Sequence, residues 1–294
     1  MIISGLLPVD KPSGHTSFDV IARLRKILGI KKLGHTGTLD PMATGVLPVL
    51  IGRACKAQAM LECADKEYIA DISFGICTDT QDITGTVIGT NPYMPTRCEL
   101  ERVIESFKGD IQQIPPMYSA IKSGGKRLYD LARQGVEVER KPRSITIYEL
   151  ELMYVDMEKR QAKIRVKCSK GTYIRTLAED MGKAAGSCAT LSALRRTMAA
   201  SFEIGQCLTL EQIESLCAGG NIAEHIVPMD RLFPRYSAIS LNEGQKKRFL
   251  NGARLTSEDL GELAKGDYRV YAGGEFLGTA VFKCGELRHQ LLNI

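Results

Sequence analysis

The 294-residue sequence predicts an α+β fold, in which helices flank a mainly antiparallel mixed sheet and a small β-rich domain follows at the C-terminal end. Two observations predict this class. Helical and strand-like patterns are mixed along the chain without the regular β–α–β repeat of a parallel sheet. A proline-containing stretch, 227–234, has the composition of a linker, and short β-like runs with glycine pairs follow it. We therefore expect two domains, at 1–232 and 233–294.

The individual elements follow from the spacing of apolar residues. A helix is expected at 16–30, because apolar residues recur on one face, Thr16 and Asp19 can form a capping box, and Gly29 can end it. A strand is expected at 162–168, where apolar and basic residues alternate. The same criteria predict helices at 96–109, 126–135, 172–186 and 209–217, and strands at 67–75, 144–155, 268–271 and 276–282.

Composition excludes several classes of protein. The chain is 44% hydrophobic and 25% charged, as in ordinary globular proteins, and its net charge of +5 permits nucleic-acid binding without requiring it. None of the nine cysteines forms a C-x-x-C pair, so we interpret them as the reduced thiols of a cytoplasmic protein. The N-terminus lacks the basic region of a secretory signal, and no apolar run is long enough to span a membrane.

Sequence motifs for metal or cofactor binding are also absent. No two of the four histidines have the spacing of a helix-borne metal pair. Neither a dinucleotide fingerprint nor a G-x-S-x-G nucleophile elbow occurs. If the chain is an enzyme, we expect it to work without a metal ion or an organic cofactor.

The stretch GHTGTLDPMATGVL, 34–47, holds a single acid, Asp40, on a Gly/Thr/Pro turn at the edge of an apolar segment. A residue before proline is pushed into an extended conformation, so the turn presents the Asp40 side chain. The stretch superficially resembles the DKTGT loop of phosphoryl-transferring ATPases, but Gly34 and His35 occupy the place of their nucleophilic acid. The alternative that remains is an ordinary helix N-cap or an Asx-turn.

Other segments supply candidate partners for this acid. CSKGTYIRTLAEDMG, 168–182, places Tyr173 and Arg175 at the junction of a strand and a helix, and an arginine near a buried acid keeps it ionised. The alternative is a core tyrosine and a solvated arginine. Tyr68 lies on the strand at 67–75, where a tyrosine taken alone is more often a core residue. Basic segments interleaved with tyrosines, chiefly 121–135 and 139–143, suit RNA binding through phosphate contacts and base stacking.

Taken together, these segments resemble the tRNA pseudouridine synthase B family, whose members isomerise the T-loop uridine at tRNA position 55. The resemblance covers most of the chain. It extends over GLLPVDKPSGHTS, KKLGHTGTLDPMATGVLPVLIGRACK, DKEYIADISFGICTDTQDITG, QIPPMYSAIKSGGKRLYDLARQG and CSKGTYIRTLAEDMG. The long HTGTLDP block combined with the CSKGTYIRT block makes it specific.

The resemblance implies roles for individual residues. The catalytic set would be an essential acid, a tyrosine that stacks on the target base and an arginine that pairs with the acid: Asp40, Tyr68 and Arg175. Further residues would contact the substrate in or beside the pocket: His35, Lys56, Asp82, Tyr173 and Leu194. An insertion around 117–146 would grip the RNA through basic residues: Lys122, Lys126, Arg127 and Arg143. The small C-terminal domain resembles the RNA-binding β-barrel called PUA.

The resemblance also accounts for the single acid. Pseudouridine formation breaks and remakes a glycosidic bond without consuming water, so the paired carboxylates of a hydrolase are unnecessary. Whether Asp40 acts as a nucleophile or as a base stays open. The target base must leave its stack, and we expect Leu47, Leu50 and Leu194 to exclude water from the pocket.

The resemblance implies a monomeric cytoplasmic enzyme whose partner is the T arm of tRNA, with no membrane, metal or cofactor. Two alternatives remain: a non-catalytic RNA-binding or tRNA-folding protein, and a guide-RNA-dependent sister enzyme of the same fold.

Overall fold

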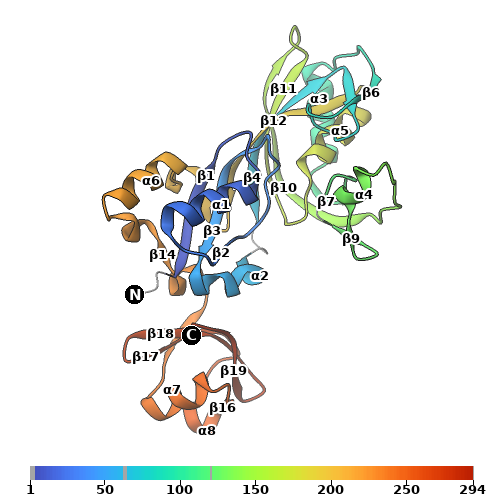
Figure 1. Ribbon diagram of the computed structural model, residues 1–294. Helices are drawn as coiled ribbons and strands as arrows, with labels where there is room; N and C mark the ends of the chain where they lie inside the picture. Colours follow the sequence, from blue (N-terminus) through green and yellow to red (C-terminus); the bar gives the residue numbers. More distant parts are fainter. Residues whose placement is uncertain (1–3, 62–64, 120, 294) are drawn as a thin grey trace.

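The computed structural model describes residues 4–61, 65–119 and 121–293 (Figure 1). A ten-stranded mixed sheet forms the body, and its strand order is β14-β1-β3-β12-β4-β11-β10-β7, with β2 paired to β3 and β13 to β12. Every pairing in this sheet is antiparallel except that of β12 with β3. A second sheet of five strands lies near the C-terminal end. The predicted α+β class is therefore confirmed.

The strands of the large sheet have the following bounds: β1 (Gly5–Lys11), β2 (Leu33–His35), β3 (Thr44–Ile51), β4 (Lys66–Phe74), β7 (Gly109–Gln113), β10 (Arg143–Asp156), β11 (Gln161–Cys168), β12 (Ala189–Ala199), β13 (Phe202–Glu203) and β14 (Val227–Pro228). The helices around it are α1 (Ser17–Leu28), α2 (Gln58–Leu61), α3 (Arg97–Ser106), α4 (Leu128–Ala132), α5 (Ile174–Ala184) and α6 (Leu210–Ala218). Two small hairpins are formed by β5 (Ile76–Thr78) with β6 (Val87–Thr90) and by β8 (Lys122–Ser123) with β9 (Lys126–Arg127).

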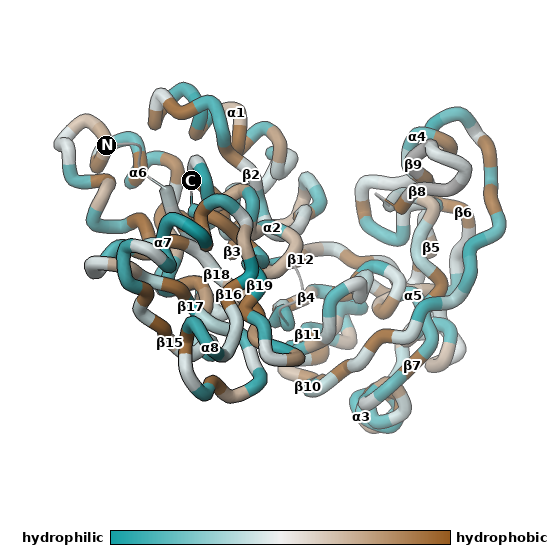
Figure 2. The backbone as a smooth tube through the Cα atoms, turned by 90° about the horizontal axis from the view of Figure 1, so that it is seen from below, coloured by the Kyte–Doolittle hydropathy of each residue, from teal (hydrophilic) through white to brown (hydrophobic). Residues whose placement is uncertain are grey.

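The C-terminal part contains β15 (Ser237–Ser240), β16 (Leu255–Thr256), β17 (Gly266–Ala272), β18 (Glu275–Lys283), β19 (Glu286–Leu292), α7 (Glu243–Leu250) and α8 (Ser257–Leu260). Its strands surround a core of their own that includes Phe249 and Val270. Figure 2 shows hydrophilic colour on the outer helices α7 and α8. In both views the segment with α4 and β9 projects away from the body (Figures 1 and 2).

The large sheet is built as two halves with separate cores. Helices α1 and α6 pack against β1 and β3, whereas α3 and α5 pack against β4, β10, β11 and β12. The halves meet where β12 runs parallel to β3, and only two residue pairs form that junction, Arg195 with Thr44 and Arg196 with Gly45. Before Thr44 the chain leaves the sheet, so the turn that carries Asp40 lies at the junction of the two halves.

Strand alternation determines which side chains face this turn. On β4, Tyr68, Ala70 and Ile72 are buried on one face. Leu194 lies opposite Ala70, and Arg196 lies opposite Tyr68, so both share that face. The alternation predicted for 162–168 is also observed, because every second residue from Ala162 to Cys168 is buried.

Two sequence predictions about local structure are wrong. The helix expected at 126–135 is only α4, because Gly124 and Gly125 adopt φ of +57° and +84° and close the β8–β9 hairpin in front of it. A glycine pair supplies the left-handed conformation of a tight two-residue turn, and that signal outweighed the helical pattern.

The expected linker at 227–234 is part of the folded body. Val227 and Pro228 pair with β1, and Met229, Leu232 and Phe233 are buried in one core with Leu6, Leu50 and Leu291. Apolar side chains in a proline-containing stretch therefore pack the C-terminal sheet against β1 and β3. Leu50 belongs to this core and Leu47 to the core beneath α1 and α6. The expectation that both leucines line a pocket at Asp40 is therefore wrong.

We predict that Gly45→Ala strongly destabilises the protein. Gly45 has φ of +103°, and an added Cβ would lie 2.1 Å from the carbonyl oxygen of Arg196. Backbone strain and overpacking together should lower the free energy of unfolding by about 3–5 kcal/mol. Gly186→Ala is the matched control, because φ is +73° there and no atom lies within 4 Å of the added carbon. It should cost about 1 kcal/mol. Equal losses in urea denaturation would contradict the close contact at the sheet junction.

Candidate active site

The turn that carries Asp40 is anchored from several sides. The amide of Ala43 donates to the carbonyl of Asp40 at 3.0 Å, and the amide of Gly14 donates to Pro41 at 2.9 Å. The hydroxyl of Ser17 accepts from the amide of Leu39 at 2.9 Å. Asp40 precedes strand β3 and not a helix, so the N-cap interpretation is excluded. Its carboxylate is therefore held on a fixed backbone.

Arg175 binds the Asp40 carboxylate with two nitrogens. Its Nε lies 2.9 Å from Oδ2, and its Nη2 donates to Oδ1 at 3.3 Å. The arginine side chain is only 6% exposed, whereas 34% of the aspartate side chain is exposed. Arg175 lies in the first turn of α5, which begins one residue after Tyr173. The pair is thus enclosed on the arginine side and open to a substrate on the carboxylate side.

Backbone oxygens fix Arg175 from behind. The carbonyl of Thr80 accepts from Nη1 at 2.9 Å, and the carbonyl of Tyr118 accepts from Nη2 at 2.8 Å. Asp82 lies 3.7 Å from Nη1, with its carboxylate also bonded to Thr80 and Thr84. The predicted substrate residue Asp82 is therefore a buried anchor of the loop that holds Arg175.

Gln81, which lies between Thr80 and Asp82, connects their loop to α5 through side-chain hydrogen bonds. It has φ of +64°, which is rare outside glycine, and it bonds the side chains of Thr176 and Glu179. Strained backbone of this kind persists where the surroundings over-determine it, and it clusters at functional sites. The loop is therefore set rigidly against the helix that presents Arg175.

Burial raises the pKa of Asp40, because desolvation of the carboxylate outweighs the attraction of Arg175. The negative charge of Asp82 raises it further, and the cationic Lys11 lowers it. Asp40 is thus a carboxylate whose charge is poorly solvated, a condition that makes an acid reactive.

A second buried cation, Lys11, ties the turn to the loop after β1. Its ammonium donates to the carbonyls of Pro12, His15 and Pro41 at 3.0, 2.6 and 3.2 Å. Desolvation lowers its pKa to about 8 from 10.5, although Asp40 acts in the opposite direction. At neutral pH the lysine is protonated and has one hydrogen for each carbonyl.

Tyr68 and Leu194 lie on the face of the sheet that the turn covers. Both belong to one buried cluster with Leu39 and Ala43, and each is 7% exposed. Burial raises the pKa of the Tyr68 hydroxyl, and the positive charge of Arg196 opposes the shift. Tyr173 is fixed at the entrance to α5 because the buried Gln113 side chain bonds both its amide, at 2.8 Å, and its carbonyl, at 3.1 Å.

For the remaining predicted residues, no direct contact with Asp40 or Arg175 is observed among the described side chains. His35 ends β2 and accepts from the amide of Gly37 at 3.3 Å, and Lys56 lies exposed in the 3₁₀ helix η1 (Gly52–Ala57). Arg143 begins β10 and acts electrostatically on Tyr173. The side chains of Lys122, Lys126 and Arg127 lie outside the described residues.

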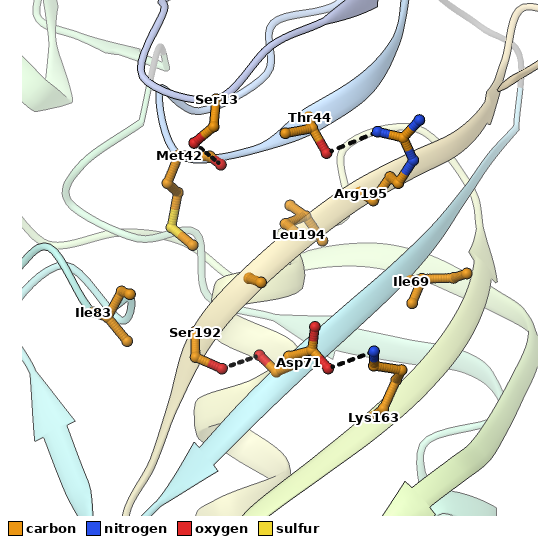
Figure 3. A pocket seen from close by; sticks show the side chains of 11 residues that line it. Ser13, Met42, Thr44, Ile69, Asp71, Ile83, Lys163, Ser192, Leu194 and Arg195 are labelled. Atoms are coloured by element: carbon orange, nitrogen blue, oxygen red, sulfur yellow. Dashed lines mark hydrogen bonds and ion pairs between the residues drawn. The ribbon is translucent and has the colours of Figure 1, made fainter.

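A cavity of about 510 Å³ lies on the other face of β4 (Figure 3). Ile69 and Asp71 line it, and they alternate with the buried Tyr68 and Ala70 along the strand. Lys163 pairs with Asp71 there at 3.2 Å. Leu194 lines this cavity too, together with Met42 and Thr44 from the stretch that follows Asp40, so the cavity adjoins the turn that carries the acid.

Sequence reasoning missed the residues that hold the site in place: Lys11, Thr80, Gln81, Gln113 and Arg196. Their letters give no signal, because lysine, glutamine and arginine are mostly exposed in proteins. Only the fold shows that Lys11, Gln113 and Arg196 are buried and that Thr80 and Gln81 bond residues of α5. Within the described part of the chain, no three potential ligands cluster as a metal site would require, and no helix has the length and apolarity to cross a bilayer.

Comparison with known proteins identifies the family. The model of the TruB family pseudouridylate synthase N-terminal domain matches residues 25–174, and the model of the tRNA pseudouridylate synthase B C-terminal domain matches 175–234. The chain belongs to the TruB family of pseudouridylate synthases. Proteins named tRNA pseudouridine synthase B are 43% identical in Azoarcus sp. over 99% of this chain and 95% of the relative, and 40% in Clostridium kluyveri over 96% of each.

Solved structures support the same fold. A chain of a Cbf5–Nop10–Gar1 complex is 25% identical with a TM-score of 0.72, over 98% of this chain and 83% of that one. A chain from an H/ACA RNP bound to a substrate RNA gives a TM-score of 0.73 at 22% identity, over 99% and 85% of the two chains. The predicted family, pseudouridine synthase fold and isomerase class are confirmed.

We predict that Arg175→Met slows the reaction and moves its acid limb to higher pH. Arg175 lowers a pKa that desolvation raises, so its removal makes the carboxylate harder to ionise. If the carboxylate is the reactive form, the rate falls as pH drops through this raised pKa, earlier in the variant than in the wild type. At pH 7 the loss should be on the order of 10²- to 10³-fold.

The measurement is the single-turnover rate between pH 5 and 8, with circular dichroism to show that the variant is folded. Arg165→Met is the matched control, because Arg165 is 38% exposed and pairs with Glu67 and Glu151 on the sheet surface. Its loss should change stability by less than about 1 kcal/mol and leave the pH profile in place. An unshifted acid limb in Arg175→Met would show that the pair does not tune Asp40.

Proposed function

We propose that this chain isomerises uridine 55 in the T loop of tRNA to pseudouridine, using Asp40 as its single catalytic acid. The observation that carries the proposal is the desolvated Asp40 carboxylate, a third exposed, held in two contacts by an enclosed Arg175. The names of the curated relatives support tRNA as the substrate.

The chemistry needs one carboxylate and no added reagent. The bond from C1′ to N1 of uracil breaks, a bond from C1′ to C5 forms, C5 loses its proton and N1 gains one. The atoms of substrate and product are therefore the same. Asp40 can form a bond to the sugar or the base, or take a sugar proton, and the alternatives stay open. Arg175 holds the carboxylate in one orientation and favours its ionised form.

The other site residues fit supporting roles. We assign stacking on the everted base to the ring of Tyr68, and closure of the pocket to Leu194 and Tyr173. His35 and Lys56 would contact the RNA beside the pocket, and Asp82 would act through the loop that holds Arg175. Eversion of the base costs a few kcal/mol, which stacking in the pocket offsets.

The remaining parts of the chain would bind the rest of the tRNA. We assign the T arm to the segment 117–146 with Lys122, Lys126, Arg127 and Arg143, and a further RNA contact to the PUA-like domain at 233–294. The domain at 1–232 would hold all of the chemistry. We propose a monomeric cytoplasmic enzyme that uses no metal ion or cofactor.

The test is to incubate the purified chain with unmodified tRNA transcript and map pseudouridine at single-nucleotide resolution. We expect modification at position 55 without any guide RNA. A chain that binds the transcript and forms no pseudouridine would be a non-catalytic RNA-binding protein. Modification only after a guide RNA is added would favour the guide-dependent alternative.

We predict that Asp40→Asn abolishes isomerisation while tRNA binding stays within a few-fold of wild type. The substitution removes the reactive charge and keeps the size of the side chain, so the loss appears in the rate. Asp71→Asn is the matched control, since that acid lies on the opposite face of β4 and pairs with Lys163. More than a few per cent of the wild-type single-turnover rate in Asp40→Asn would reject the assignment.

We also predict that tRNA affinity falls steeply with salt and that the basic segment carries part of this dependence. Each lysine or arginine that neutralises a phosphate contributes roughly −0.7 to −0.9 to the log–log slope. Lys126→Ala or Arg143→Ala should flatten the slope by about that amount per substitution. The control is Lys159→Ala in the turn between β10 and β11, where the lysine side chain is 74% exposed. An unchanged slope in all of the site variants would place the tRNA on another surface.

A further inference from the structure

Ser119 carries a buried hydroxyl that has no hydrogen-bond partner. The residue lies in the segment 117–146, directly after Tyr118, and is 5% exposed. Within the part of the chain that the structure describes, its Oγ neither donates nor accepts a hydrogen bond. A hydroxyl in this state has lost its hydration without compensation, and such a group in a folded protein requires an explanation.

The backbone of Ser119 is fixed beside the catalytic ion pair. The preceding carbonyl, that of Tyr118, accepts from Nη2 of Arg175 at 2.8 Å. The amide of Ser119 donates to the carbonyl of Met117 at 2.9 Å, and its carbonyl accepts from the amide of Tyr129 at 3.1 Å. The unpartnered hydroxyl is therefore held one residue away from a group that contacts the guanidinium bound to Asp40.

Tyr173 lies on the same side of the site. Burial raises the pKa of the Tyr173 hydroxyl, Ser119 and Arg175 oppose the rise, and Asp40 adds to it. The hydroxyls of Ser119 and Tyr173 nevertheless do not meet hydrogen-bond geometry. Ser119 thus acts on the same phenol as the two residues of the ion pair, and its own hydroxyl stays available.

An everted uracil would bring unmet hydrogen-bonding groups into this pocket. Its imide edge consists of two carbonyls on either side of an N–H, and each of these groups needs a partner once it has left water. Arg175 cannot supply one, because all three of its nitrogens are engaged with Asp40, Thr80 and Tyr118. A serine hydroxyl can donate to a carbonyl or accept from an N–H, so it suits any part of that edge.

We propose that the hydroxyl of Ser119 binds the imide edge of the everted uracil. The inference rests on the proposed function, because it requires a uridine in this pocket. Turning uracil about the axis through N3 and C6 exchanges N1 with C5 and one carbonyl with the other, so the imide edge returns to the same place. One hydroxyl can therefore hold the base before and after it turns, including the interval in which no bond joins it to the sugar.

The first experiment compares Ser119→Ala with Ser187→Ala as a matched control. Ser187 is 6% exposed, but its hydroxyl donates to the carbonyl of Tyr93. We expect Ser119→Ala to keep or raise the midpoint of urea denaturation, because no bond is lost, and to lower kcat/KM for unmodified tRNA on the order of 10-fold. Ser187→Ala should lower the midpoint and leave kcat/KM within about twofold of wild type.

Two results of this comparison would overturn the proposal. A Ser119→Ala protein that loses as much stability as Ser187→Ala, or fails to fold, would show that the hydroxyl is bonded in the free protein. An unchanged kcat/KM in a stable Ser119→Ala protein would show that the substrate does not need it.

The deciding experiment asks whether the contact is with the base. A tRNA transcript with an abasic residue at position 55 is used as a competitive inhibitor of the wild-type and Ser119→Ala enzymes. Because this transcript has no uracil, its inhibition constant should change less than about twofold while kcat/KM for the uridine transcript falls on the order of 10-fold. Equal losses for both transcripts would place the contact on the RNA backbone and reject the assignment.

These outcomes are separate from failure of the proposed function. If the wild-type chain forms no pseudouridine in tRNA, the function itself is wrong. If the wild type is active and the two transcripts lose equally, the function stands and only the role of Ser119 falls.

Discussion

The contact between Asp40 and Arg175 is the constraint on which the rest of the site depends. A carboxylate removed from water loses solvation that one cation only partly replaces, and its pKa stays raised even with Nε of Arg175 at 2.9 Å. The pair persists because the arginine is itself fixed by the carbonyls of Thr80 and Tyr118. The turn with Asp40, the loop with Thr80 and helix α5 must therefore keep fixed relative positions for this one acid to be presented. Most of the buried polar residues described above maintain those positions.

The split sheet explains where this acid can be placed. Each half has its own core, and the parallel pairing of β12 with β3 extends over only two residue pairs. A turn emerging from that short junction is anchored at both ends and is still free of strand pairing between them. Gly45 permits the close approach, since its missing side chain would lie 2.1 Å from the backbone of Arg196. The junction thus gives a loop residue the rigidity of a strand residue.

The sequence predicted the helices and strands better than it predicted the segments between them and the buried polar contacts. Alternation at 162–168 and the capping box of Thr16 and Asp19 are local patterns, and both appear in the structure. The stretch at 227–234 was misjudged because proline indicates a break, whereas Met229 and Phe233 are core residues. Asp40, Tyr68 and Arg175 could be named from motifs. Lys11, Gln113 and Arg196 could not, because their importance comes from burial, and burial follows from tertiary packing that no local pattern encodes.

The ionisable groups of the site are held at the expense of folding stability, as the signs of their pKa shifts require. The folded-state pKa of Asp40 is raised above its ordinary 3.8, so the free energy of unfolding falls as pH rises from 3.8 through the raised value. Lys11 has a folded-state pKa of about 8 against 10.5, so its desolvation cost is fully present below pH 8 and is relieved between pH 8 and 10.5. In their charged forms both groups oppose folding. A fold selected for stability alone would have apolar side chains at both positions.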